Sequence, residues 1–255
     1  MSDTLLKFLA GTFLIETPII FSWVIFLFAS GITIFQNHPF LKSRPHTRTA
    51  RVDDPSACAE RSRSAQRNSP FGVEVYSWLI GVVVVFKFFI SFLETFLQYY
   101  VWEKNPFTKI LLTQPLSEKV PNEIIPGFIR KILFDNPHGA FLYYAWGHFF
   151  LNVFLSVFSA IVFYFLLVLL RKYRERFFGD GEVALGTLMG LIVGWPNIVL
   201  FVPAALILTV LFSIVRRIVW GKNYTTLGWS FLVSGFVILV FGKFLSDLFH
   251  LRVLG

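Results

Sequence analysis

Charged residues and cysteines are scarce in this chain of 255 residues. Charged residues make up 15% of the chain, against about 25% in an average soluble domain, which argues against a soluble enzyme and against a disordered chain. Cys58 is the single cysteine, so an internal disulfide, a secreted disulfide scaffold and a four-cysteine zinc site are excluded. No short apolar stretch ends in a small-residue cleavage site, so we expect the first apolar run to be retained as a membrane span.

Apolar and aromatic residues are abundant, in contrast to the charged residues. Hydrophobic residues make up 55% of the chain, with 32 Phe among them, and several runs exceed the roughly 18 residues that a helix needs to cross a bilayer. We expect long helices over 5–35, 76–102, 139–170, 197–215 and 227–249. A short helix over 183–195 should precede the fourth, because Gly194-Trp195-Pro196-Asn197 predicts a stop and a turn. The predicted fold class is an all-α, polytopic integral membrane helical bundle with about six transmembrane helices.

The hydrophilic stretch between the first two runs differs in composition from the rest of the chain. It is rich in Ser, Ala and Arg and has almost no large apolar residues, so we expect a disordered insert over 38–75. The insert separates a membrane segment over 1–37 from a membrane helix and amphipathic region over 76–138, which includes an interfacial helix over 123–134. A membrane domain over 139–255 completes the predicted organisation.

The net charge of +8 comes from basic residues that gather between the apolar runs. Membrane topology and attraction to anionic lipid account for such clusters, so membrane lipid is an expected partner and nucleic acid is not. The positive-inside rule predicts that the basic loops 38–70, 171–182 and 216–226 lie in the cytoplasm and that 103–138 lies outside.

The stretch from Gly179 to Glu182 has the most informative local pattern. Gly179 and Gly181 flank Asp180, and Glu182 opens the short helix. Glycine permits a close approach of another segment, and a carboxylate in the first turn of a helix is favoured by the helix dipole. From the residues alone, Asp180 and Glu182 are helix-capping and dipole partners in a cytoplasmic loop.

A longer series of motifs resembles the type IV prepilin peptidase family, which are membrane-embedded aspartic peptidases. The resemblance covers about residues 139–249 and rests on Gly179, Gly181, Glu182, Leu185, Gly190, Gly194, Trp195, Gly228, Phe231, Leu232 and Gly235. It implies a protein of the bacterial inner membrane that needs no cofactor and no metal. It also implies cleavage of the basic leader of a pilin-like precursor. In this chain Glu182 stands at the family's motif aspartate and Ala184 at its lysine.

Peptide hydrolysis by this chemistry needs two carboxylates, one as general base and one as proton donor. The resemblance assigns Glu182 as one catalytic acid. The position of the family's other aspartate is occupied by Tyr99 or by Gln114, depending on the register, so Glu94 and Glu103 are the nearest candidates for the second acid. Glu94 could equally belong to a structural polar stripe with Lys87 and Gln98.

Three functions therefore stay open. The first is an aspartic-type prepilin peptidase. The second is a catalytically inactive relative that acts as a membrane scaffold or as a pilin-binding subunit. The third is a small transporter-like protein, since helices interrupted by glycine and proline can line a substrate path.

Overall fold

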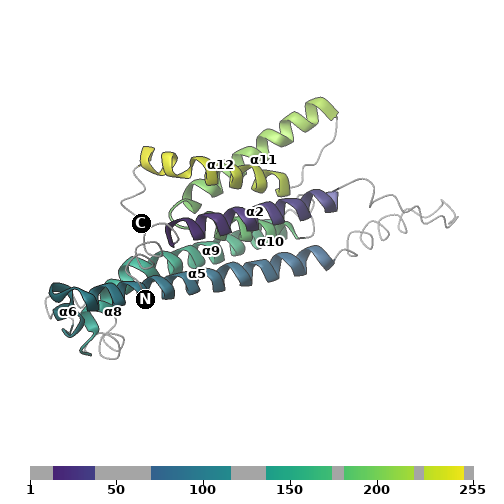
Figure 1. Ribbon diagram of the computed structural model, residues 1–255. Coiled ribbons are helices and arrows are strands. Elements are labelled where there is room, and N and C mark those ends of the chain that lie inside the picture. The colour runs from purple at the N-terminus through teal and green to yellow at the C-terminus, as the bar shows by residue number, and fades with distance from the viewer. Residues whose placement is uncertain (1–13, 38–69, 116–135, 174–180, 221–226, 250–255) are drawn as a thin grey trace. The chain divides into compact units, whose positions relative to one another are not determined.

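The computed structural model describes residues 14–37, 70–115, 136–173, 181–220 and 227–249, and these segments are helical and contain no strand (Figure 1). The first two long helices are α2 (Leu14–Asn37) and α5 (Pro70–Lys104). The third is a continuous helix formed by α8 (Gly139–Ala145), η3 (Trp146–Phe150) and α9 (Leu151–Tyr173). Two more long helices follow, α11 (Ile198–Trp220) and α12 (Leu227–Leu248). The short helices are α6 (Pro106–Leu112) and α10 (Glu182–Val193). The all-α prediction is confirmed.

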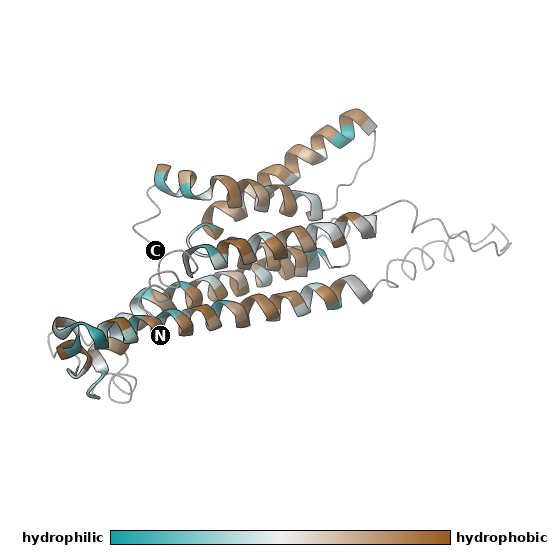
Figure 2. Ribbon diagram, in the orientation of Figure 1, coloured by the Kyte–Doolittle hydropathy of each residue, from teal (hydrophilic) through white to brown (hydrophobic). Residues whose placement is uncertain are grey.

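Five of these helices are long and apolar enough to cross a membrane. The spans are Glu16–Ile34, Val73–Lys104, Gly139–Tyr173, Ile198–Val219 and Leu227–Leu248, and Figure 2 shows the apolar residues along them. The expected number of about six counted α10, which has 12 residues. At 1.5 Å per residue α10 is about 18 Å long, short of the roughly 30 Å hydrocarbon core. The chain is therefore an integral membrane protein, with five helices among its described residues that are long and apolar enough to span the bilayer.

The observed helix ends agree best with the predictions where glycine and proline interrupt the chain. α10 ends at Val193 and α11 begins at Ile198, and Gly194 between them has a φ of 69°, which favours glycine. α5 begins at Pro70, earlier than the predicted 76, because hydropathy detects the bilayer crossing and not the helix end. The interfacial helix predicted over 123–134 and residues 38–69 of the predicted insert lie outside the described residues.

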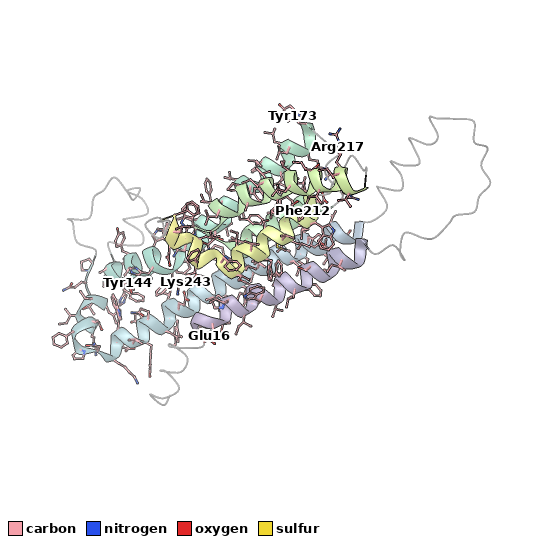
Figure 3. All side chains as sticks on the ribbon, turned by 90° about the horizontal axis from the view of Figure 1, so that it is seen from above. Glu16, Tyr144, Tyr173, Phe212, Arg217 and Lys243 are labelled. Atoms are coloured by element: carbon pink, nitrogen blue, oxygen red, sulfur yellow. The ribbon has the colours of Figure 1, made fainter. Side chains whose placement is uncertain are left out.

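Two helices with basic final turns, α9 and α11, run into loops that the charge pattern predicts to be cytoplasmic, whereas α5, with Lys104 in its last turn, runs into the region predicted to lie outside. Arg171 and Lys172 lie in the last turn of α9, and Arg217 lies in the last turn of α11. Figure 3 labels Tyr173 and Arg217, which mark these two ends. The side of the membrane on which they lie stays a prediction.

The chain divides into two compact units. The first contains residues 1–20 and 84–155, and in it the C-terminal part of α5 packs against η3 and the start of α9. The Ser91 hydroxyl donates a hydrogen bond of 3.2 Å to the backbone carbonyl of Phe149 in the π-turn η3. Two edge-to-face aromatic pairs, Phe88–Phe154 and Phe92–Phe150, flank this bond. Aromatic packing and one interhelical hydrogen bond thus hold this pair of segments together.

The second unit contains residues 21–83 and 156–255 and is built around α10. All of α10 except Ala184 is buried. Along the face of α12 toward α10, glycines recur every seven residues, at 228, 235 and 242. A Cβ added to these glycines would meet Glu182, Met189 and Asn197, respectively, at 3.2–3.3 Å. Small residues at this spacing let two helix backbones approach closely, so the glycines of α12 position it directly on α10.

Candidate functional site

The site begins at the tight turn that leads into α10. Gly181 caps the helix with a φ of 87°, in the left-handed region that favours glycine. Glu182 is then the first residue of α10, and its side chain is 8% exposed. The predicted helix start is therefore confirmed, and it places a carboxylate in the interior of the second unit. Gly179 and Asp180 lie outside the described residues.

The carboxylate of Glu182 binds the N-terminus of α12. Its Oε2 accepts a hydrogen bond of 3.2 Å from the backbone N–H of Leu227, and its Oε1 accepts one of 3.0 Å from the backbone N–H of Gly228. These N–H groups belong to the first turn of α12, where no intrahelical acceptor exists. The positive end of the helix dipole also favours a negative charge there. Glu182 therefore caps α12, while it also lies in the first turn of its own helix α10.

Gly228 makes this approach possible. A Cβ at this position would lie 3.3 Å from Oε1 of Glu182 and 3.7 Å from Cδ2 of Leu185. The glycine thus leaves room for the carboxylate beside the backbone of α12. The same glycine is part of the motif on which the family resemblance rests.

Hydroxyl groups surround the first turns of α10 and α12. Thr187 donates to the carbonyl of Val183 at 2.8 Å, and Ser234 donates to the carbonyl of Ser230 at 2.7 Å. Ser230 itself is fully buried, and its hydroxyl has no hydrogen-bond partner among the described residues. The interior here is more polar than hydropathy alone indicates, and most of its polar groups bond to backbone.

The other predicted acids lie in the first unit. Glu94 is half-buried in the α5 span, nearer to its C-terminal end, and Glu103 is exposed near the end of α5. Among the described residues of the second unit, the acids besides Glu182 are Glu74 and Asp247, and both are exposed. The pairing of Glu182 with Glu94 or Glu103 stays a prediction.

The two positions that could correspond to the family's other aspartate have different surroundings. The Tyr99 ring packs edge-to-face on Phe141 with centroids 5.4 Å apart, and its centroid lies 6.3 Å from that of the His138 ring. Gln114 is exposed just after α6. In the first register, aromatic packing occupies the position where the family has a catalytic carboxylate.

No group of three or more His, Cys, Asp or Glu side chains in the described part of the chain could hold a metal ion. Comparison with protein-family models, with curated proteins and with solved structures finds no match for this chain. The resemblance to prepilin peptidases therefore rests on the motif residues alone.

Sequence reasoning did not find the bond partners of Glu182. They are 45 and 46 residues away in the chain, and backbone N–H groups leave no mark in a sequence. Gly228 was the available signal, because a glycine at the start of a membrane helix allows a close approach.

Proposed function

We propose that this chain is a non-catalytic, prepilin-peptidase-like protein of the bacterial cytoplasmic membrane, and that it holds a pilin-like precursor in the bilayer as a scaffold or binding subunit. The observation that supports this function best is the engagement of both carboxylate oxygens of Glu182 by the backbone of α12. The carboxylate at the family's motif position thus has a structural task.

The chemistry of the two-acid mechanism favours the inactive alternative. A peptidase acid must bind water and exchange a proton with its partner during the reaction. Glu182 is buried against helix α12, and the other acids in the described part of its unit are exposed. The departures at Ala184 and at Tyr99 or Gln114 also remove residue types on which the family's reaction depends.

Binding of a precursor, unlike its cleavage, requires no pair of catalytic carboxylates. The resemblance implies a ligand with a basic leader followed by an apolar helix. Such a helix would meet the protein inside the bilayer, where α11 exposes the apolar side chains of Ile207, Val210 and Ile218, each at least 59% exposed. Close packing between apolar helices is the usual source of association in a membrane.

The test is co-expression of the full chain with a pilin-like precursor, followed by affinity purification and measurement of the precursor mass. We expect the precursor to co-purify and to keep its leader, both with the wild-type chain and with Glu182→Gln. A single-span protein of similar hydropathy without a basic leader is the matched control, and it should not co-purify.

Two results would contradict this function. Removal of the leader by the wild-type chain, lost in Glu182→Gln, would establish the peptidase instead. A precursor that is neither cut nor retained would exclude both pilin-related functions and leave the transporter-like alternative.

A further inference from the structure

The most exposed and the most buried side chains of α5 lie on different sides of the helix. Its most exposed apolar side chains, each at least 60% exposed, are Trp78, Val85, Phe89, Phe92 and Phe96. At 3.6 residues per turn these lie within about 40° of one line along the helix. The buried side chains, each at most 7% exposed, are Tyr76, Leu79, Val83, Ile90, Ser91 and Leu97, and they lie on the opposite side.

Glu94 lies in the middle of the buried face. All six buried side chains are within about 60° of its direction around the helix. Tyr76 is five full turns before it on the same face, and the Tyr76 hydroxyl lies 2.8 Å from the Thr33 hydroxyl of α2. Glu94 therefore lies on the side of α5 that carries its buried side chains, opposite its most exposed ones.

Other polar residues share this side of the helix. Lys87, Ser91, Thr95 and Gln98 lie within about 100° of Glu94 around the helix and within two turns of it along the helix. We call these five residues the polar face of α5. Ser91 donates to the carbonyl of Phe149 at 3.2 Å and Thr95 donates to the carbonyl of Ser91 at 2.8 Å, so both hydroxyls have partners.

Glu94 differs from these hydroxyls. Its side chain is half-buried within the span Val73–Lys104, and no hydrogen bond or ion pair with another described residue engages its carboxyl group. An ionised carboxylate without a partner is costly inside a membrane, and the group commonly takes up a proton instead. Part of the Glu94 side chain stays accessible at the surface of the described structure.

We propose that Glu94 is an intramembrane proton-binding site, whose carboxylate takes a proton from water and returns it to water. Gln98, one turn further on the same side, supplies an amide between Glu94 and the nearer end of the span at Lys104. This site is independent of the function proposed for the chain, because neither scaffolding nor binding of a precursor needs it.

Few charged groups face Glu94 from the described elements around it. Its own helix carries the cations Lys87 and Lys104 and the acids Glu74 and Glu103. The segment packed against this part of α5, residues 139–170, contains no Asp, Glu, Lys or Arg, and its single histidine, His148, is exposed and stacks on Tyr144. The N-terminal part of the same unit contributes Glu16, which is exposed.

The test uses dicyclohexylcarbodiimide, a lipid-soluble reagent that adds to protonated carboxyl groups in apolar surroundings, on the full chain in lipid vesicles. Peptide mass spectrometry measures the labelled fraction of Glu94 as the pH is raised. We expect labelling at low pH that falls about tenfold per pH unit above the midpoint of the titration. Glu94→Gln should lose the label, whereas Glu103→Gln, at an exposed carboxyl of the same helix, should keep it.

Two results would overturn the proposal. An unlabelled Glu94 at every pH, in a protein whose circular dichroism spectrum is that of the native helices, would mean that the carboxylate is permanently ionised or shielded. Equal labelling at every pH would mean that it does not exchange its proton. Both results come from the wild-type chain, so they do not depend on the folding of a variant.

Discussion

Replacement of Gly186 by alanine tests the packing of α10 most directly. A Cβ at this position would lie 2.7 Å from Cδ1 of Leu167 and 2.9 Å from Cε2 of Phe231, where ordinary contacts begin at 3.4 Å. Both neighbours are fully buried. The Phe231 ring is also held between Phe163 and Phe201, with centroids 6.1 and 6.4 Å away. Neither side chain has free space to move into, so alanine overpacks the core.

The magnitude follows from two opposing effects. Overpacking of a tight core destabilises a protein by about 1–3 kcal/mol, and replacement of glycine by alanine within a helix stabilises it by up to about 1 kcal/mol. Gly31→Ala and Gly81→Ala are matched controls in the same unit, because a Cβ at either position meets nothing within 4 Å. We therefore expect Gly186→Ala to unfold at a free energy about 1–3 kcal/mol below the controls.

Equilibrium unfolding in mixed detergent micelles, followed by circular dichroism, measures this difference. A second measurement in a Leu167→Ala background should show a smaller effect of Gly186→Ala, because the nearest obstructing atom is gone. If Gly186→Ala is as stable as Gly31→Ala and Gly81→Ala, the close packing of α10 against α9 and α12 is wrong.

Two further predictions use the same unfolding assay. In a double-mutant cycle, Thr33→Val and Tyr76→Phe should show a coupling of about 0.6 and at most about 1.7 kcal/mol, because their hydroxyls are 2.8 Å apart; additive effects would contradict this bond. Glu182→Asp should lower the free energy of unfolding by about 1–2 kcal/mol, since the shorter side chain no longer reaches both N–H groups of α12. Unchanged stability of Glu182→Asp would show that the capping bonds contribute little.

The sequence allowed the helices to be predicted better than their contacts. Apolar runs identified the five spans, and Gly194 with Pro196 marked the break between α10 and α11, because both signals are local in the chain. The π-turn η3 was not predictable in this way, since hydropathy is the same for α- and π-turns. The π-turn is apparent only in the backbone of the folded chain, where the Ser91 hydroxyl bonds to the carbonyl of Phe149 within it.

The sequence predicted a residue of the candidate site, Glu182, but not its hydrogen-bond partners. Glu182 was selected because a carboxylate follows Gly181 at the start of a membrane helix, and the structure confirms both the glycine turn and the helix start. The contact with Gly228 depends on how α12 packs against α10, which is a tertiary property. The side of α5 on which Glu94 lies likewise follows from the exposure of the side chains around that helix. A hydropathy profile averages over all sides of a helix and does not show this.

The side chain at position 182 affects both the stability of the fold and the chemistry that the chain can perform. A carboxylate that caps α12 is most useful when its two hydrogen bonds persist, whereas a catalytic carboxylate must change its partners at each step of the reaction. The family's aspartate is shorter by one methylene, about 1.5 Å, and at this backbone position it would stand back from the N–H groups of Leu227 and Gly228. Glutamate reaches them at 3.2 and 3.0 Å. The reach of glutamate to both N–H groups fits a capping role and agrees with the non-catalytic function proposed above.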